Sequence, residues 1–421
     1  MTSTLHGSLM DPCMESMNFL NNITGVYPEA ISFAPGRPIE ITYDVENIKV
    51  YFDTYVQYLS KEKNYSTDYI ITKLFQYGRT EGFLQPLLAN MLNITDRITT
   101  PQENIVVTSG AQEAMVIALR TLFSDADDVL LIPEPVYVGI VGAARLLDID
   151  IESFDISEHG ISENNLISKI EQIYKIGKKV KALYINAEFN NPVGSSLSLS
   201  QKKWLIALAQ KHDFYIIEDN PYGVFSNVEK TSDTLYSLGN EKVIYIGSFS
   251  KTVFPSARVG FLCSEFLAES FTKIKSMLTL NTSAISQAIV GGVLLNCEGN
   301  LIRHCEQQIK IYQENLKHLM LELDSVFSNS SIQYKITWNR PDGGFFMIVS
   351  LPFIVEDYDL SISAKDFGVI WAPLDIFYIK EIKSNKIRLS FSYLTVDEIK
   401  EGVKRLKEFV DFRMNKLRNV K

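Results

Sequence analysis

Residues 243–261, VIYIGSFSKTVFPSARVGF, open with a short β-branched apolar run that is typical of a buried strand. A polar loop follows, in which Lys251 stands among serines, seven residues before Arg258. Hydroxyls and a guanidinium can bind a phosphate, and an amine beside them can attack a carbonyl of the same ligand. A solvated surface lysine would explain the same loop, so the interpretation depends on the rest of the chain.

This combination predicts a site for pyridoxal 5′-phosphate (PLP), a cofactor held by its phosphate and by a covalent bond to a lysine. In this hypothesis Lys251 forms the covalent bond, and Ser248, Ser250 and Arg258 bind the phosphate. The chain should then also carry an acid for the ring nitrogen, a donor to the phenolate oxygen and a flat side chain against the ring.

The composition is that of an ordinary folded protein of 421 residues, with 46% hydrophobic and 22% charged residues. A net charge of −9 argues against a nucleic-acid or anionic membrane surface as partner. The four cysteines form no CxxC pair, and with only five histidines we expect no metal site and no disulfide framework. Reduced thiols and the lack of a signal-peptide pattern predict a cytoplasmic protein.

From about residue 104 the chain alternates short apolar runs with helical patterns, which predicts an α/β fold with a mostly parallel sheet sandwiched by helices. The predicted strands are 105–108, 129–132, 149–154, 182–186, 214–218, 243–246 and 259–263. The predicted helices among them are 111–123, 138–147, 163–174 and 200–211.

After residue 282 the rhythm changes, with helices predicted at 284–295 and 301–326. Strands at 334–338, 344–351 and 387–391 and a helix at 396–414 follow. We therefore expect a smaller α+β domain at the C-terminal end. The expected division is an N-terminal arm and part of the small domain at 1–50, a large PLP-binding domain at 51–290 and the small domain at 291–421.

Carboxylates follow the apolar run 214–217 in the segment Glu218-Asp-Asn-Pro-Tyr222. Ligands of α/β sheets bind at the carboxyl ends of the strands. Placed against a pyridine nitrogen, Asp219 would keep that nitrogen protonated through a charge-assisted hydrogen bond worth about 1.5–3 kcal/mol. A helix or turn cap is the alternative for the same residues.

Two further strand ends carry groups suited to the same ring. Asn191, in Ala187-Glu-Phe-Asn-Asn-Pro-Val-Gly194, could donate to the phenolate oxygen, as could Tyr222. Tyr137, in Pro133-Glu-Pro-Val-Tyr137, could stack on the ring. Plain turn chemistry and a core tyrosine are the alternatives.

Two other positions suit anions. The backbone N–H groups of Gly110, Ala111 and Gln112 begin a predicted helix and could bind a phosphate, while the absence of GxGxxG disfavours a dinucleotide. Arg388 lies in the middle of an apolar strand and could bind a substrate α-carboxylate, or form a structural salt bridge.

Taken in order, these motifs resemble the fold-type I, class I/II PLP-dependent aminotransferases, most closely their 2-aminoadipate/kynurenine aminotransferase-like branch, over roughly residues 18–417. The resemblance implies that Lys251, Asp219 and Tyr222 are catalytic and that Lys251 carries the proton between substrate and cofactor. It implies cofactor-binding roles for Gly110, Ala111, Gln112, Tyr137, Asn191, Asp219, Tyr222, Ser248, Ser250, Lys251, Arg258 and Tyr77.

The resemblance also implies that Gly36, Asn191 and Arg388 bind substrate, and that Tyr77 reaches the phosphate of a neighbouring subunit. A homodimer with shared active sites is therefore expected. Two departures stand out: residues 372–377, APLDIF, lack the glycine of the family's Pro-Gly-x-x-Phe loop, and Arg37 replaces a leucine. We interpret Arg37 as a surface residue rather than a substrate contact.

The predicted function is transfer of an α-amino group between an L-amino acid and a 2-oxo acid. One alternative keeps the cofactor but breaks another bond at Cα, as in a decarboxylase, a β/γ-lyase or a cyclase. Another is an aminotransferase-like effector-sensing domain of a transcription regulator. The few residues ahead of Phe33 and the acidic charge disfavour that second alternative.

Overall fold

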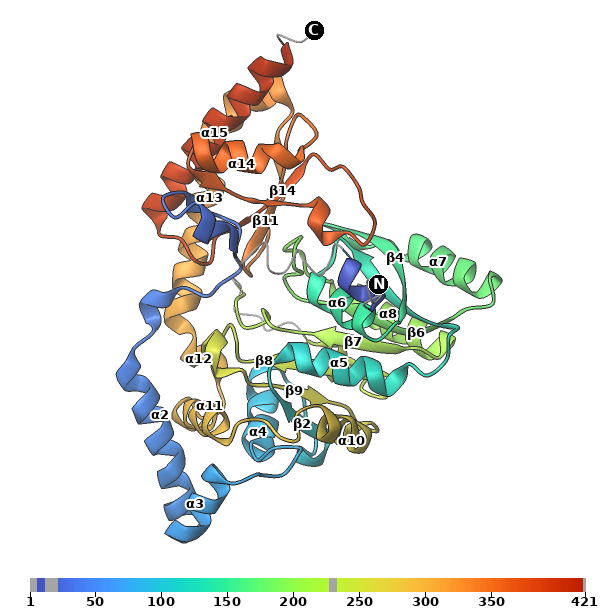
Figure 1. The fold of residues 1–421 in the computed structure, drawn as a ribbon, viewed down its shortest axis with the longest axis vertical. Helices are drawn as coiled ribbons and strands as arrows, with labels where there is room; N and C mark the ends of the chain where they lie inside the picture. Colours follow the sequence, from blue (N-terminus) through green and yellow to red (C-terminus); the bar gives the residue numbers. More distant parts are fainter. Residues whose placement is uncertain (1–5, 12–21, 227–232, 419–421) are drawn as a thin grey trace, which may run out of the picture.

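In the computed structural model, residues 6–11, 22–226 and 233–418 are described. An eight-stranded sheet lies at the centre (Figure 1). Its strand order is β2 (Ile105–Thr108), β9 (Gly260–Cys263), β8 (Val243–Ser248), β7 (Tyr215–Asp219), β6 (Lys179–Ile185), β3 (Asp128–Glu134), β4 (Asp150–Ser157) and β5 (Gly160–Ile161). The strands from β8 to β4 in this order are parallel, whereas β9 is antiparallel to both neighbours and β5 to β4. The predicted mostly parallel α/β sheet is confirmed.

Alternate residues of the strands feed two apolar cores, because successive side chains point to opposite faces of a sheet. Leu183 and Ile185 of β6 belong to one core, and Ala182 and Tyr184 to the other. The first core is covered by α2 (Val45–Gln57), α3 (Thr67–Phe75), α4 (Gln85–Thr95), α7 (Glu163–Lys175), α8 (Leu199–His212) and α11 (Ala284–Asn296). The second is covered by α5 (Ala111–Leu122), α6 (Val138–Leu146) and α10 (Ala268–Leu278).

A second, four-stranded antiparallel sheet follows in the C-terminal part, in the order β10 (Thr337–Trp338), β11 (Phe346–Ser350), β14 (Lys386–Ser390) and β13 (Ala372–Pro373). It packs with α13 (Glu306–Tyr334), α14 (Asp357–Asp366) and α15 (Val396–Arg418) around a third core. The N-terminal strand β1 (Ile31–Ser32) pairs with β12 (Val369–Ile370), so the chain passes through this part before it enters α2 (Figure 1).

Two predicted elements differ from the structure. The helix expected at 301–326 is divided into α12 (Leu301–His304) and α13, with Cys305 between them. The Cys305 thiol donates to the Thr252 carbonyl at the break. The strand expected at 334–338 is confined to Thr337–Trp338, because α13 continues to Tyr334 and neither proline nor glycine interrupts it.

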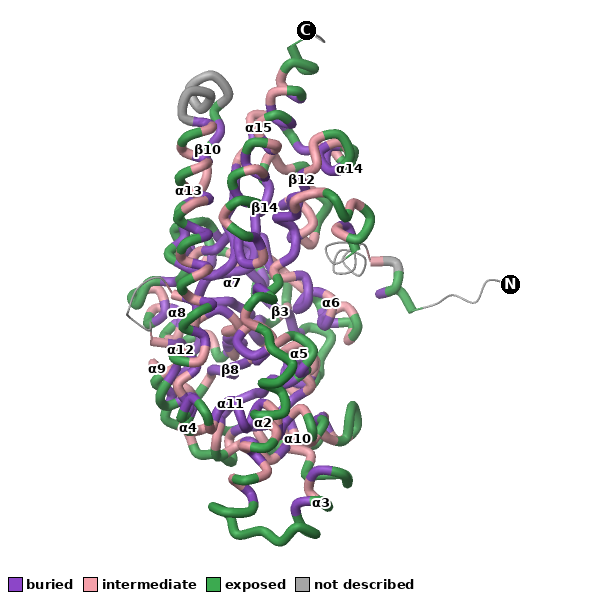
Figure 2. The backbone as a smooth tube through the Cα atoms, turned by 90° about the vertical axis from the view of Figure 1, so that its left-hand side faces the viewer, coloured by how far each residue is buried: buried purple, intermediate pink, exposed green. Residues whose placement is uncertain are grey.

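Buried residues lie mainly along the sheets, whereas residues of α3 and of the end of α15 are mostly exposed (Figure 2). No helix in the described ranges is both long and apolar enough to cross a membrane.

Candidate active site

A cavity of about 270 Å³ lies at the carboxyl ends of β6, β7 and β8 and is closed by residues of the second sheet. Parallel strands place their carboxyl ends along one edge, so residues far apart in sequence meet there. Every predicted site residue except Gly110 and Tyr77 lines this cavity. The lining includes Gly36, Ala111, Gln112, Tyr137, Asn191, Asp219, Tyr222, Ser248, Ser250, Lys251, Arg258 and Arg388.

The Lys251 amine donates to the Gly36 carbonyl at 2.8 Å. Burial, assisted by the positive charges of Arg388, Arg258 and Arg37, lowers the pKa of Lys251 from 10.5 to about 8, and only Asp219 opposes the shift. A large fraction of the amine is therefore uncharged near pH 8. An uncharged amine is the form that attacks a carbonyl carbon.

Asp219 ends β7 and lines the same cavity as this amine. Its Oδ2 accepts hydrogen bonds from the Tyr184 hydroxyl at 2.7 Å and from Asn186 Nδ2 at 3.1 Å. Its Oδ1 is buried and has no hydrogen-bond partner within the described part of the chain. Burial raises the pKa of Asp219 to about 6, against the effect of these two bonds and of the Lys251 charge. The carboxylate is thus held in place with one oxygen available for a cationic N–H.

Another part of the cavity suits an anion. Arg258 donates to the Ser109 carbonyl at 3.1 Å and to Ser250 Oγ at 3.4 Å, while the Ser248 hydroxyl oxygen accepts from the Ser250 N–H. Gly110 precedes α5 with φ of +91°, and a Cβ there would lie 2.4 Å from the Arg258 guanidinium. Only glycine allows the arginine to lie across the helix N-terminus, where N–H groups favour a phosphate.

Asn191 lies between Arg388 and Tyr222. Arg388 Nη1 donates to Asn191 Oδ1 at 2.8 Å, so the Asn191 amide nitrogen is the group that can face the Tyr222 hydroxyl, where it acts to lower the pKa of Tyr222. The Tyr222 hydroxyl hydrogen can then be donated into the cavity. The Arg388 guanidinium lies 4.3 Å from the ring centre of Phe346 and 4.7 Å from that of Phe377. Burial lowers the pKa of Arg388 to about 10, which leaves it charged at neutral pH.

Three other predicted residues, Tyr137, Gln112 and Tyr77, differ in how they lie relative to the cavity. Burial raises the pKa of Tyr137 to about 12, so its ring is a neutral lining surface. Gln112 directs its side-chain amide to the Gly139 carbonyl at 2.9 Å, which leaves its backbone N–H as the group that can serve an anion. Tyr77 is 84% exposed and lies away from the cavity.

Four contributing residues were not anticipated from the sequence: Tyr184, Asn186, Phe346 and Phe377. Tyr184 and Asn186 share one face at the end of β6, beside the strand that ends in Asp219. Their position next to that strand end is the signal that could have identified them as partners of Asp219. Phe377 lies in the loop that lacks the expected glycine, and it contacts Arg388.

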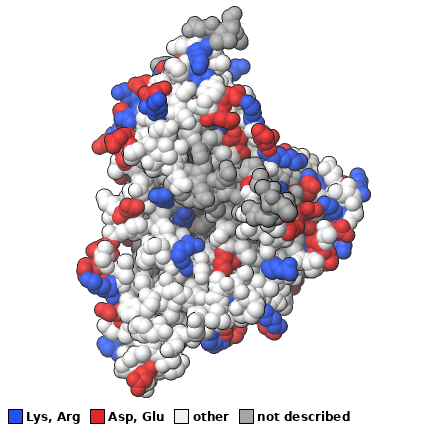
Figure 3. All heavy atoms as spheres, viewed as in Figure 1, with Lys and Arg blue, Asp and Glu red and all other residues white. Residues whose placement is uncertain are grey.

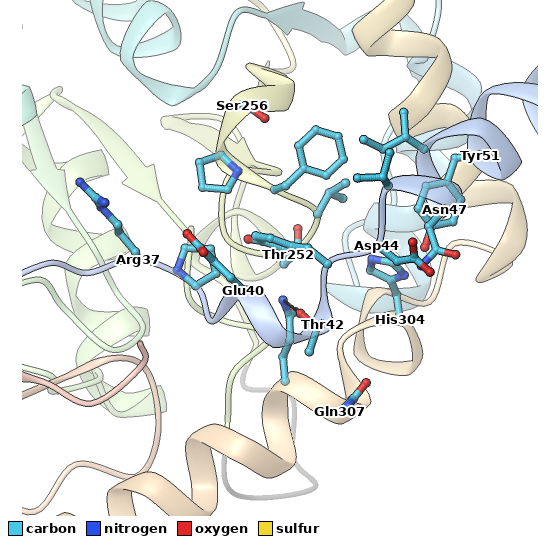
Figure 4. Close-up of a pocket in the computed structure, with 18 residues that line it drawn as sticks. Arg37, Glu40, Thr42, Asp44, Asn47, Tyr51, Thr252, Ser256, His304 and Gln307 are labelled. Atoms are coloured by element: carbon cyan, nitrogen blue, oxygen red, sulfur yellow. Dashed lines mark hydrogen bonds between the residues drawn. The ribbon is translucent and has the colours of Figure 1, made fainter. Parts of the chain in front are cut away.

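A second cavity, of about 550 Å³, adjoins the first at Pro255. It lies between the segment that begins at Arg37, the loop after Lys251 and the start of α13 (Figure 4). Arg37 is exposed and lines this second cavity rather than the first, in line with its interpretation as a surface residue.

The residues of the first cavity fit PLP. An oriented carboxylate oxygen, a tyrosine hydroxyl, an amine of lowered pKa and a helix N-terminus with an arginine supply partners for the ring nitrogen, the phenolate oxygen, the carbonyl carbon and the phosphate. No cluster of three or more potential metal-ligating side chains occurs in the described residues.

Comparisons with known proteins agree with this chemistry. The family described as aminotransferase class I and II matches residues 61–406. The chain is 40% identical to an (S)-3,5-dihydroxyphenylglycine transaminase of Amycolatopsis orientalis, over 98% of this chain and 94% of that protein.

Two solved structures are similar as well. A multiple substrate aminotransferase from Thermococcus profundus superposes with a TM-score of 0.82 at 28% identity, covering 95% of each chain. A kynurenine aminotransferase from Pyrococcus horikoshii, solved with PMP, has a TM-score of 0.82 at 26% identity, covering 94% of each chain. The chain belongs to the class I and II aminotransferases and is a PLP-dependent aminotransferase of fold type I.

Proposed function

We propose that the amino donor is an L-amino acid with an aromatic side chain, and that arylglycines are among the donors accepted. The observation that carries this proposal is the aromatic surround of Arg388, formed by Phe346 and Phe377 with Tyr222 edge-on to Phe346. Flat rings of this kind favour contacts with an aromatic substrate bound through its carboxylate. The dihydroxyphenylglycine specificity in the name of the 40% identical relative supports the same class.

In the proposed mechanism Arg388 binds the α-carboxylate through its planar guanidinium, and the Gly36 backbone lies beside it. Lys251 would hold PLP covalently, and its amine would take up and deliver the proton at the substrate Cα. When bound, PLP supplies an electron sink for the carbanion formed at Cα. Asp219 keeps a proton on the ring nitrogen through Oδ1.

The other site residues bind and orient in this proposal. Asn191 and Tyr222 hold the phenolate oxygen, and Tyr137 stacks on the ring. The phosphate is bound by the backbone of Gly110, Ala111 and Gln112 together with Ser248, Ser250 and Arg258.

A half-reaction assay tests the donor class. The purified holoenzyme is mixed with one amino acid at a time, and loss of the visible absorption band of the lysine-linked cofactor is followed. We expect phenylglycines and phenylalanine to react with kcat/KM about 10- to 100-fold higher than alanine, because a buried aromatic ring adds about 1.5–3 kcal/mol. Higher kcat/KM for 2-aminoadipate than for all aromatic donors would contradict the proposal.

We also propose a homodimer with shared active sites. Large apolar side chains are exposed along the first helices and on α10: Ile41, Val45, Phe75 and Met277 are 74%, 73%, 70% and 84% exposed. On the face shown in Figure 3, charged side chains lie mostly toward the outline and the lower surface is largely uncharged. Exposed Tyr77 is then available to reach the phosphate of the other subunit.

Mixing two defective variants tests this sharing. Tyr77→Phe is expected to weaken cofactor binding about tenfold through loss of one hydrogen bond to a phosphate. A hybrid with Lys251→Ala carries one site with both residues intact if Tyr77 acts across the interface. Unfolding and refolding an equal mixture should restore about a quarter of the wild-type activity at limiting cofactor, since half of random dimers are hybrids with one intact site. No gain over the separate variants would place Tyr77 within its own subunit.

Two other expectations remain proposals. The division into an arm at 1–50, a large domain at 51–290 and a small domain at 291–421 is supported by the two separate sheets and by the pairing of β1 with β12. A cytoplasmic location without a nucleic-acid partner is supported by the free, buried thiols of Cys263, Cys297 and Cys305 and by the net charge of −9. Detection in a membrane-free cell fraction would test the location.

A further inference from the structure

The turn that carries Tyr222 is shaped by a side chain rather than by the backbone alone. Asn220 Oδ1 accepts a hydrogen bond from the Gly223 N–H at 3.0 Å, and the Asn220 N–H donates to the Ile246 carbonyl at 3.0 Å. A Cβ on Gly223 would lie 2.6 Å from Asn220 Oδ1, so a larger residue there would displace the amide. The position of Tyr222 therefore depends on how the Asn220 amide is held.

The other end of that amide is fixed by two further residues. Because Oδ1 faces Gly223, Nδ2 faces away and donates to the Tyr245 hydroxyl oxygen at 3.0 Å. The Tyr245 hydroxyl donates in turn to Asp96 Oδ2 at 3.0 Å. We call Asp96, Tyr245 and Asn220 the Asp96 relay; none of its members lines the cavity that holds Lys251.

The relay is confined to one arrangement by its surroundings. The Tyr245 ring lies 6.0 Å from the Phe261 ring and 6.3 Å from the Tyr236 ring, and Tyr245 is 2% exposed. Burial raises the pKa of Asp96 to about 7, and the hydrogen bond from Tyr245 works against that rise. A buried polar group without a hydrogen-bond partner lowers the stability of the fold, so loss of one bond in this relay rearranges the neighbouring groups.

On the cavity side, the Tyr222 hydroxyl meets Asn191, which is itself held by Arg388. Tyr222 is thus constrained at its hydroxyl by the cavity residues and at its backbone by the Asn220 amide. A change in the turn would alter the direction in which the hydroxyl donates, while the residues of the cavity stay in place.

We propose that Asp96, Tyr245 and Asn220 are positioning residues that direct the Tyr222 hydroxyl toward the cofactor oxygen. This inference rests on the proposed role of Tyr222. A bond donated to that oxygen stabilises its negative charge, so the proton on the Lys251 nitrogen is released at lower pH. Misplacing Tyr222 raises the pH at which the visible band of the holoenzyme changes.

The test is a pH titration of that visible band. Tyr222→Phe is expected to raise its apparent pKa by about one unit, and Tyr245→Phe by about half a unit. In a Tyr222→Phe background, Tyr245→Phe should cause no further shift, because its effect passes through Tyr222. Tyr236→Phe is the matched control, since its buried hydroxyl lies near Thr100 and outside the relay; it should leave the titration unchanged.

Asn220→Ala and Asp96→Ala interrupt the relay at other points, so the result does not depend on one variant folding. If Tyr222→Phe leaves the titration unchanged, the proposed role of Tyr222 is wrong and the relay role falls with it. If Tyr222→Phe shifts it but the folded relay variants do not, the relay role alone is wrong. A shift by Tyr245→Phe that is equal in both backgrounds would show a structural effect independent of Tyr222.

Discussion

Lys251→Ala should abolish covalent attachment of the cofactor and lower the transamination rate by about 10⁴-fold, the upper range for loss of a positioned general acid–base group. Among the residues that the structure describes, Lys251 is the only lysine that lines the cavity with Asp219. Its amine has a lowered pKa, so one group there can both attack a carbonyl and carry a proton.

Borohydride reduction followed by peptide mass analysis measures the attachment. In the wild type, reduction should fix the cofactor on the peptide that contains Lys251. Lys275→Ala is the control and should keep the cofactor attached, because Lys275 is also buried but pairs with Glu113 outside the cavity. Cofactor retained covalently on the Lys251→Ala protein at another lysine, with turnover intact, would contradict the assignment.

The pH dependence of attachment gives the same prediction a second readout. Since the pKa of Lys251 is lowered to about 8, the rate at which apoprotein takes up PLP should rise with pH and level off above about 8. An amine with the ordinary value of 10.5 would give a rate that still rises steeply at higher pH. Absorbance at the visible band follows the uptake directly.

Asp219→Ala should lower kcat by about 10²- to 10³-fold while leaving the covalent bond to Lys251 in place. Without the carboxylate the ring nitrogen loses its proton at neutral pH, and the ring accepts electrons less readily. The substitution also leaves the Tyr184 hydroxyl without its acceptor, at a cost of about 1–3 kcal/mol in unfolding free energy, whereas the Asn186 amide keeps its bond to the Asp219 backbone carbonyl.

A cofactor analogue methylated at the ring nitrogen separates these effects, because it carries the positive charge permanently. Reconstituting Asp219→Ala with the analogue should recover part of the lost kcat. The thermal stability of the Asp219→Ala apoprotein, which is measured without any cofactor, is a separate effect of the substitution. Asp219→Asn keeps the size of the side chain but not its charge, and should be as slow as Asp219→Ala with the natural cofactor. Wild-type kcat in Asp219→Asn would rule out the proposed role of the carboxylate.

Most of the sheet was predictable because its signals are local. Runs such as 243–246 and 214–218 are short, β-branched and bounded by polar loops, which is enough to place a buried strand. The break at Cys305 was not predictable, since it coincides with a hydrogen bond to Thr252, a residue 53 positions away. The extension of α13 to Tyr334 was also missed, because that segment has only a weak helical periodicity. It contains no helix-breaking residue, so nothing in it ends the helix earlier.

The sequence by itself determined which chemical groups stand at the strand ends, because side-chain type and strand period are properties of short segments. Lys251 and Asp219, which follow or end strands, and Arg388, which lies within one, could therefore be proposed as amine, acid and carboxylate partner from local patterns together with their order along the chain. Only the tertiary structure decided how these groups are oriented: which oxygen of Asp219 is available, and that Asn191 has only its amide nitrogen left for other partners because Arg388 occupies its oxygen. Such directions depend on hydrogen-bond partners brought together from distant segments, and no local pattern encodes them.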